Sequence, residues 1–129
     1  ASAAHIQQLM GEFEQGPLRE YTPCQSDAVG EIAYALALVH TELVLIHPFR
    51  EGNGRVARLL ASLMALQAGL PLLDFGPIKN RKRQGYFAAV RAGMKRDYQP
   101  MAKIFSEVIQ KTLTGPAKSE DLQGKHGRP

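Results

Sequence analysis

Apolar residues recur along most of the chain at the intervals of an amphipathic α-helix. The first face follows the pattern i, i+3, i+4, i+7 and consists of Ile6, Leu9, Met10 and Phe13. Gly16 and Pro17 predict the end of this helix. Ser26 or Asp27 can cap a second helix, because their side-chain oxygens accept the first free backbone N–H groups. We expect that helix to run to about Ile46 and to bury Val29, Ile32, Ala33, Leu36, Val39, Leu43 and Ile46.

A third helix is predicted from about Asn53 to Ala68, and its apolar residues surround the helix axis. They are Val56, Leu59, Leu60, Leu63, Met64 and Leu66. A helix without a polar face is usually buried on all sides, so this segment is predicted to be the central helix of the fold. Gly69 is suited to end it, because glycine adopts the left-handed conformation of a C-terminal cap without strain.

Two more helices are predicted towards the C-terminus. A basic helix spans roughly residues 80–94, and a last one begins near Pro100, since the first helical turn does not use the N–H that proline lacks. The buried face of the last helix is expected to consist of Met101, Ile104, Phe105, Val108 and Ile109. The sequence contains no strand-like alternation of useful length. We therefore predict an all-α bundle over residues 1–113 around a central buried helix, followed by a disordered tail, residues 114–129.

The composition fits one soluble domain. The chain has 129 residues, of which 44% are hydrophobic, enough for a core of its own. The single cysteine, Cys24, excludes an internal disulfide framework and is expected to be a free structural thiol. Residues 1–10 lack the layout of a signal peptide, and the apolar run 56–73 is interrupted by Arg58, Gln67, Gly69 and Pro71. We expect a cytoplasmic protein with no membrane partner.

The net charge of +4 comes from one segment. Residues 79–96 contain seven basic residues and no acidic one, whereas acidic residues outnumber basic ones in the remainder of the chain. Such a patch can attract nucleic acid, phosphate or an acidic protein surface. A charged helix face exposed to water is the commoner reason for it. Nucleic acid is therefore not the favoured partner, and a basic helical module that binds nucleotides or nucleic acid without catalysis is kept as an alternative function.

The residues most indicative of chemistry form the string HPFREGNGR, residues 47–55, between the second and third helices. Gly52 and Gly54 have no Cβ, so a ligand can approach their backbone closely. They precede a helix, whose free N–H groups and positive dipole end together favour phosphate. Arg55 and Arg58 are three residues apart on one face of that helix and can bind further phosphate oxygens.

Three other side chains of this string indicate what the site does with a phosphate. Glu51 would repel an anion unless a divalent cation such as Mg²⁺ joins its carboxylate to the phosphates. His47 lies just before the loop, and its imidazole can act as a general base. Phe49, an aromatic residue between polar ones, is interpreted as an inward structural anchor that fixes the loop. Each residue alone also fits an ordinary cap or a structural role, but the joint pattern favours a nucleotide–Mg²⁺ site for phosphoryl or nucleotidyl transfer.

The same string resembles the signature of a known family. HPFREGNGRVAR is similar to HPFx[D/E]GNGRxxR, the long and specific motif of the Fic (filamentation induced by cAMP) family. Residues 40–46 resemble the family's approach to the motif, H-x-x-F-x-x-I, with Leu43 where phenylalanine is common. Residues 83–87, RQGYF, resemble the family's later R-x-x-Y-Y element, so the likeness covers roughly residues 1–113. It implies a Fic-type helical fold and a protein adenylyltransferase, which transfers AMP from ATP to a hydroxyl of a target protein.

The resemblance also implies a role for each residue of the motif. His47 would take the proton from a tyrosine, threonine or serine hydroxyl of the target, and Glu51 would hold Mg²⁺ between the α- and β-phosphates. The residues implied at ATP are Gly52 and Gly54 at the phosphates, Asn53 near the α-phosphate, Arg55 at the β-phosphate, Arg58 at the γ-phosphate, and Tyr86 and Phe87 near the base. Gly54 favours AMP transfer, because the phosphotransferase branch of the family has lysine at this position.

Regulation and alternative reactions complete what the resemblance implies. No sequence precedes Ala1, so the flap on which relatives dock the target is expected to be absent. The inhibitory motif [S/T]-x-x-x-E-[G/N], whose glutamate blocks the arginine matching Arg58, does not occur in the sequence. Three alternatives stay open: inhibition by an antitoxin or an inhibitory helix in trans, as in a toxin–antitoxin pair, inhibition by N-terminal sequence outside these residues, and no inhibition. Phosphoryl transfer and removal of AMP by the same site are the alternative reactions.

Overall fold

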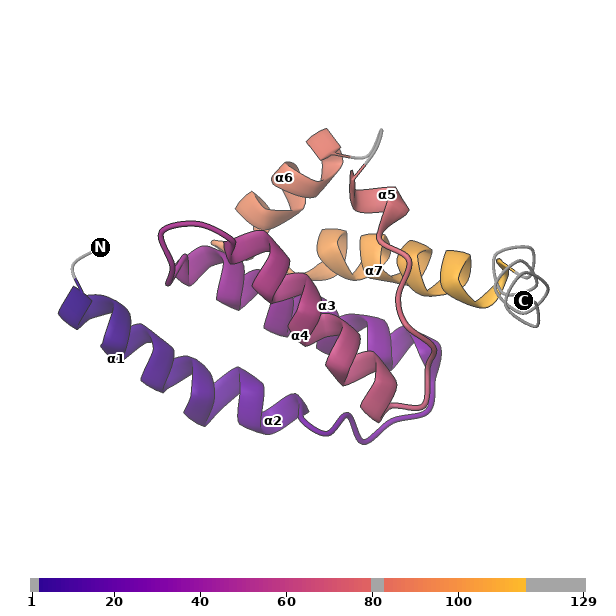
Figure 1. Ribbon diagram of the computed structural model, residues 1–129, viewed down its shortest axis with the longest axis horizontal. Helices are drawn as coiled ribbons and strands as arrows, with labels where there is room; N and C mark the ends of the chain where they lie inside the picture. Colours follow the sequence, from indigo (N-terminus) through magenta and orange to yellow (C-terminus); the bar gives the residue numbers. More distant parts are fainter. Residues whose placement is uncertain (1–2, 80–82, 116–129) are drawn as a thin grey trace, which may run out of the picture.

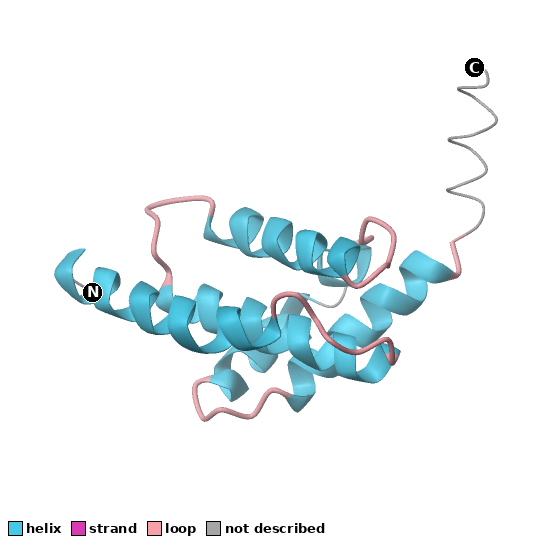
Figure 2. Cartoon of the chain, turned by 90° about the horizontal axis from the view of Figure 1, so that it is seen from below, coloured by secondary structure: helices cyan, strands magenta, loops and turns pink. Residues whose placement is uncertain are grey.

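The computed structural model describes residues 3–79 and 83–115, and all regular structure in these two ranges is helical (Figure 1, Figure 2). The elements are α1 (Ala3–Phe13), the π-helical turn η1 (Glu14–Leu18), α2 (Arg19–Tyr21), α3 (Val29–Ile46), α4 (Asn53–Gln67), α5 (Gly76–Lys79), α6 (Arg83–Gly93) and α7 (Gln99–Leu113). The all-α prediction is confirmed. The predicted tail falls outside the described residues from residue 116 onwards.

The helix at the centre of the fold is α3. It packs against α7 and α4, and over smaller areas against α6 and α1 (Figure 1). The predicted inward residues that it buries are Ile32, Ala33, Leu36, Val39 and Leu43, and Val29 and Ile46 at its ends are partly buried. By length and composition alone α3 could cross a membrane, and half of it is buried inside the protein. The helix α3 ends at Ile46, the residue before the motif, so the motif begins at the end of a rigid element.

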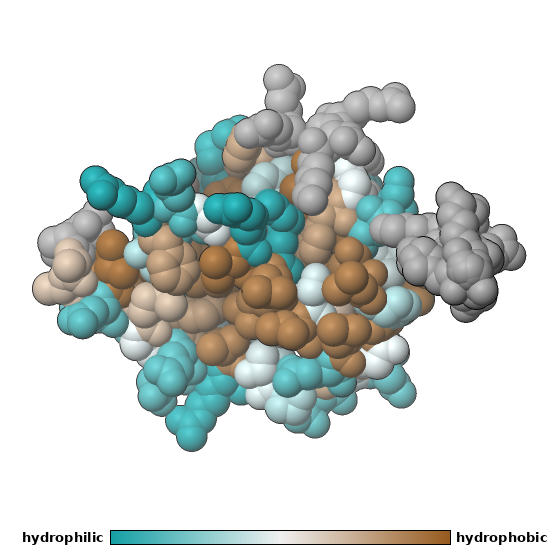
Figure 3. Space-filling model, in the orientation of Figure 1, coloured by the Kyte–Doolittle hydropathy of each residue, from teal (hydrophilic) through white to brown (hydrophobic). Residues whose placement is uncertain are grey.

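The helix after the motif, α4, is not the central one, and this prediction is wrong. α4 packs onto α3 through a face whose buried residues include Ala57, Ala61 and Ala65. Alanine lets two helices approach closely, and the alanine face of α4 is therefore the one that meets α3. The larger apolar side chains lie on the other side of α4 and point outwards. They are 39–59% exposed and comprise Val56, Leu59, Leu63 and Leu66. Figure 3 shows the apolar surface that results across the middle of this view of the molecule.

The first helix does not end at Gly16 and Pro17, as the sequence had predicted. The chain continues from α1 through η1 into α2, so that the three form one rod along the side of the bundle (Figure 1). Pro17 lies inside the π-helical turn. Proline lacks the N–H that an α-helical turn would use, and the wider π-turn changes the local pairing around it. The rod therefore extends to Tyr21 before the chain turns towards α3.

The cap at the end of α4 is the predicted one, whereas the cap at the start of α3 differs from the prediction. Ala28, and neither Ser26 nor Asp27, is the residue before α3. Ser26 nevertheless braces this entry, because its Oγ accepts a hydrogen bond from the Ala28 N–H at 3.0 Å and donates one to the Glu31 carboxylate. After α4, Gly69 has φ +90°, and the N–H of Leu70 bonds back to the Ala65 carbonyl, as predicted for a glycine cap.

The last helix is as predicted. α7 includes Pro100 in its first turn, and its buried face comprises Met101, Ile104, Phe105, Val108 and Ile109. The described part of the basic helix is α6, which ends at Gly93, and residues 80–82 of the predicted span 80–94 lie outside the described residues. The helix α6 packs against both α7 and α3.

Gly93 permits the close approach of α6 to α3. A Cβ at Gly93 would lie 2.2 Å from Cγ2 of Thr41, a fully buried residue. We expect Gly93→Ala to force α6 away from α3 and to lower the free energy of unfolding by about 1–3 kcal/mol, the usual range for overpacking. Thermal unfolding followed by circular dichroism measures the effect.

Gly85→Ala is the matched control on the same helix. An added Cβ at Gly85 meets nothing within 4 Å, so this variant should be as stable as the natural chain or slightly more stable. Equal stability of the two variants would show that α6 does not depend on close packing at Gly93.

Candidate functional site

The loop between α3 and α4 presents the motif at the end of α3. His47 ends α3 with a left-handed backbone, φ 55° and ψ 57°, and its N–H bonds to the Leu43 carbonyl at 3.2 Å. This conformation is uncommon outside glycine, asparagine and aspartate, and it turns the chain sharply out of the helix. The His47 side chain is exposed, as a general base that meets a substrate must be.

Asn53 fixes the shape of this loop. Its Oδ1 accepts a hydrogen bond from the Phe49 N–H at 2.8 Å, and its Nδ2 donates one to the Phe49 carbonyl at 2.7 Å. Asn53 is 8% exposed. Both ends of the amide are thus engaged with backbone, which closes the loop over residues 49–53. The contact with the α-phosphate stays a prediction. The side chain of an asparagine at a helix start commonly bonds to nearby backbone. The position of Asn53 could therefore have indicated its two hydrogen bonds to the Phe49 backbone.

Phe49 does not anchor the loop through its ring. The side chain is 48% exposed, so the predicted inward placement is wrong. It borders, with Pro48, a shallow groove against α1 and η1, where Met10 and Leu18 are among the neighbours. The backbone of Phe49, held by Asn53, fixes the loop in place of the ring.

Each motif glycine lies close to the guanidinium group of an arginine of α4. A Cβ at Gly52 would be 3.2 Å from an Nη of Arg55, and one at Gly54 would be 3.1 Å from an Nη of Arg58. Gly52 also has φ +81°, a conformation that other residues adopt only with strain. Two guanidinium groups are therefore held close to the N-terminus of α4, where backbone N–H groups also favour an anion.

Six of the predicted site residues meet around one cavity of about 440 Å³. The predicted residues that line it are His47, Asn53, Gly54, Arg58, Tyr86 and Phe87. Val44 of α3 and Ile78 of α5 complete the lining. Glu51, Gly52 and Arg55 are not among the lining residues, and they belong to the adjoining loop and first turn of α4. The cavity has the size of a small-molecule site and joins the motif to a helix about thirty residues further along the chain.

A buried hydrogen bond beside this cavity escaped the sequence analysis. His40 Nε2 lies 2.6 Å from Tyr86 Oη, and His40 is 1% exposed. Burial lowers the pKa of His40 to about 4, with a smaller contribution in the same direction from the Arg58 charge. Burial raises the pKa of Tyr86 to about 12. Both partners are therefore neutral at pH 7. In the sequence, His40 is only the first residue of the approach to the motif, which gave no indication of a partner on α6.

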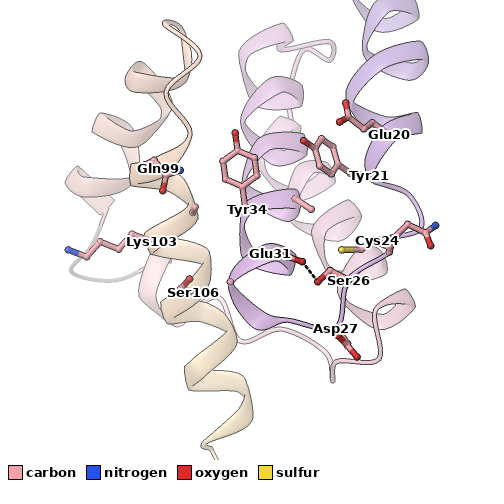
Figure 4. Close-up of a pocket in the computed structure, with 14 residues that line it drawn as sticks. Glu20, Tyr21, Cys24, Ser26, Asp27, Glu31, Tyr34, Gln99, Lys103 and Ser106 are labelled. Carbon is pink, nitrogen blue, oxygen red and sulfur yellow. Dashed lines mark hydrogen bonds between the residues drawn. The ribbon is translucent and has the colours of Figure 1, made fainter.

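A larger hollow, of about 940 Å³, lies at the other end of α3 (Figure 4). It is lined by α2, the first turns of α3 and the first half of α7, and includes Tyr21, Cys24, Tyr34 and Lys103. None of its lining residues belongs to the motif. Its size alone does not make it the catalytic site, because His47, Asn53 and Arg58 gather at the smaller cavity.

Comparison with known proteins decides the family. The Fic/DOC family model matches residues 1–65, half of the chain. This chain belongs to the Fic/DOC family. Relatives named protein adenylyltransferase Fic, from Drosophila willistoni and Drosophila grimshawi, are 34% and 35% identical to it over 105 residues. Each alignment covers 81% of this chain and 20% of the relative, so the chain spans about a fifth of the length of these curated relatives.

The Fic/DOC match contains the whole motif loop but ends inside α4. His47, Asn53 and Arg58 lie within the matched residues, whereas Tyr86 and Phe87 come from α6, beyond them. The fold thus brings two aromatic residues of α6, Tyr86 and Phe87, to the cavity that the Fic motif lines.

Glu51 of the Fic motif fits the part of a Mg²⁺ ligand. Its side chain is exposed and makes no hydrogen bond or ion pair with the residues that the structure describes. Within those residues, no three histidine, cysteine, aspartate or glutamate side chains gather into a metal site. A single carboxylate is sufficient where substrate phosphates supply further ligands, which is the usual arrangement for Mg²⁺.

Proposed function

We propose that this chain is the catalytic part of a protein adenylyltransferase, which transfers AMP from ATP to a hydroxyl of a target protein. The observation that carries the proposal is the cavity that brings His47 together with Arg58, Gly54 and the N-terminus of α4. An exposed imidazole and an anion site side by side suit nucleotidyl transfer to an external hydroxyl. The curated name of the Drosophila relatives supports the same activity.

The reaction forms one bond and breaks one. The hydroxyl oxygen of a target tyrosine, threonine or serine attacks the α-phosphorus of ATP, and the bond from the α-phosphorus to the bridging oxygen breaks. Pyrophosphate leaves with the electron pair of that bond. The hydroxyl proton passes to the His47 imidazole, which is exposed where a target would approach. Arg55, Arg58 and the N–H groups of α4 stabilise the charge on the leaving pyrophosphate.

Mg²⁺ is proposed as the cofactor, with Glu51 as the residue that would hold it. When bound, the ion neutralises phosphate charge. The carboxylate of Glu51, which is exposed and has no partner among the described residues, supports this assignment.

The aromatic residues of α6 are proposed to bind the nucleoside side of ATP. The rings of Tyr86 and Phe87 have centroids 5.7 Å apart and meet edge to face. Both line the cavity, and Phe87 is 46% exposed. An exposed aromatic ring offers a base an apolar surface for stacking.

Gly54 favours AMP transfer over phosphoryl transfer. The Arg58 guanidinium lies 3.1 Å from the place of a Cβ at Gly54. A long side chain at Gly54 would displace this guanidinium and change how the phosphates are held. With glycine there, Arg58 can stay over the N-terminus of α4.

The inhibitory partner is proposed to act in trans, from a separate chain in the cytoplasm. It would have to neutralise Arg58, the arginine that lines the cavity with His47. A carboxylate presented to this guanidinium would compete with phosphate for the same hydrogen bonds.

Removal of Arg58 is expected to weaken ATP binding. Loss of hydrogen bonds from a charged donor typically costs about 1.5–3 kcal/mol, so we expect Arg58→Ala to raise the Kd for ATP by about tenfold or more. Titration calorimetry on the folded variant measures this. Arg19→Ala is the control, because Arg19 is exposed on α2 and bonds only to Gln15 in the described structure. Equal affinity in the two variants would contradict the phosphate assignment.

Isotopic labelling tests the reaction itself. The chain is incubated with cell lysate, Mg²⁺ and ATP labelled at either the α- or the γ-phosphorus. Transfer of the α-label to protein, with none of the γ-label, is the expected result. Transfer of the γ-label would support phosphoryl transfer, the alternative reaction of the same site.

A further inference from the structure

His40 is a polar residue buried where four helices meet. It belongs to α3, bonds to Tyr86 of α6, and meets the ring of Phe105 of α7 edge to face at 5.2 Å. The backbone of Ala57 in α4 partly offsets the effect of burial on its pKa. The Ala57 backbone is near enough to raise the pKa of His40, but Nδ1 has no hydrogen bond of regular geometry to the described residues, so the bond from Nε2 to Tyr86 is the well-formed one.

This bond joins two neutral groups. Burial holds the pKa of His40 near 4 and that of Tyr86 near 12, so the imidazole is unprotonated and the phenol keeps its proton at pH 7. A buried pair of this kind fixes the position of one side chain relative to the other, because each group loses its hydrogen-bond partner if the other moves. The edge-to-face contact between the same two rings, at 5.7 Å, restricts their arrangement further.

Two consecutive residues of α3 hold the two ends of α6. His40 bonds to Tyr86 near the start of α6, and Thr41 touches α6 where Gly93 ends it. The hydroxyl of Tyr86 bonds to the buried His40, and Tyr86 is also one of the residues that line the cavity with His47 and Arg58. The position of Tyr86, and of Phe87 beside it, therefore depends on His40.

We propose that His40 is a positioning residue of the nucleotide site, which holds Tyr86 through its hydroxyl so that Tyr86 and Phe87 form the aromatic wall of the cavity. This inference rests on the proposed function. His40 itself is buried and does not touch the nucleotide. Its effect is expected on ATP affinity and not on the chemical step, which belongs to His47.

Four variants test the role of the hydrogen bond. Tyr86→Phe keeps the ring and removes the hydroxyl, and His40→Leu removes the imidazole. His40→Gln keeps a polar group near the place of Nε2. Tyr34→Phe is the control, because this tyrosine packs against Tyr98 and lines the other hollow. Each variant is first shown to be folded by circular dichroism, and Kd for ATP and kcat for transfer are then measured.

We expect Tyr86→Phe and His40→Leu to raise the Kd for ATP about five- to tenfold, with kcat changed less than twofold. His40→Gln should restore affinity to within about twofold of the natural chain, and combining Tyr86→Phe with His40→Leu should cost no more than either alone. Tyr34→Phe should bind like the natural chain. If His40→Leu does not fold, Tyr86→Phe and His40→Gln still decide the question.

The result that overturns the inference is distinct from the one that overturns the function. If the natural chain binds ATP and the folded variants bind it equally well, His40 has only a structural role and the proposed function is unaffected. Loss of affinity in His40→Gln as large as in His40→Leu would also overturn it. Absence of ATP binding by the natural chain would overturn the proposed function, and this inference with it.

Discussion

Replacement of His47 by alanine is expected to lower the rate of AMP transfer by about a hundred- to ten-thousand-fold, the usual contribution of a general base. ATP binding should change less than twofold. The imidazole is exposed at the end of α3 and lines the cavity beside Arg58, so its removal affects the hydroxyl proton and leaves the phosphate contacts in place. Transfer is measured with ATP labelled at the α-phosphorus, and binding by calorimetry.

His47→Asn is the sharper variant of this experiment. His47 has φ 55°, and alanine is strained in this conformation, whereas asparagine adopts it more readily. Asparagine cannot accept the proton at neutral pH, so this variant removes the base while it keeps the turn. Transfer at the natural rate by His47→Asn would contradict the role of His47. Loss of transfer in His47→Ala alone would assign the effect to the backbone.

Acid is expected to destabilise the protein through His40. Its folded-state pKa, about 4, lies below the ordinary value of 6.5, so the unfolded chain takes up the proton first as the pH falls. The contribution of His40 is thus complete above pH 6.5 and is lost between pH 6.5 and 4. It amounts to about 3 kcal/mol, since each pKa unit corresponds to about 1.4 kcal/mol. Urea unfolding at a series of pH values measures it.

His40→Gln is the control for this pH dependence. Carboxyl groups also take up protons in acid, so the natural chain and the variant are compared at each pH. The difference between their free energies of unfolding should change by about 3 kcal/mol from pH 7 to pH 4, with the natural chain relatively more stable at pH 7. A constant difference would mean that His40 is not buried in its neutral form.

The sequence was sufficient for features that depend on neighbouring residues. The end of α3 at Ile46, the start of α4 at Asn53 and the cap at Gly69 follow from local spacing and turn chemistry. Of the residues in HPFREGNGR, His47, Asn53 and Gly54 line one cavity, because the loop between α3 and α4 keeps them within a few residues of each other.

Features that depend on distant contacts could not be predicted in the same way. The apolar residues around α4 indicated burial on every side, but the alanines at 57, 61 and 65 decided which side meets α3. Phe49 looked like an anchor because it is aromatic, yet its backbone is the part that is held. His40 and Tyr86 are 46 residues apart, and only the packing of α6 on α3 brings them together.

The central claim is the transfer of AMP to a target hydroxyl with His47 as the general base, and the mass of the modified protein tests it most directly. Lysate proteins are incubated with ATP, Mg²⁺ and either the natural chain or His47→Asn, and are then analysed by mass spectrometry. We predict a gain of about 329 Da, the AMP moiety, on a tyrosine, threonine or serine of a target, in the natural sample only. A His47-dependent gain of about 80 Da would mean phosphoryl transfer and would contradict the claim, as would a gain of AMP that is equal in both samples.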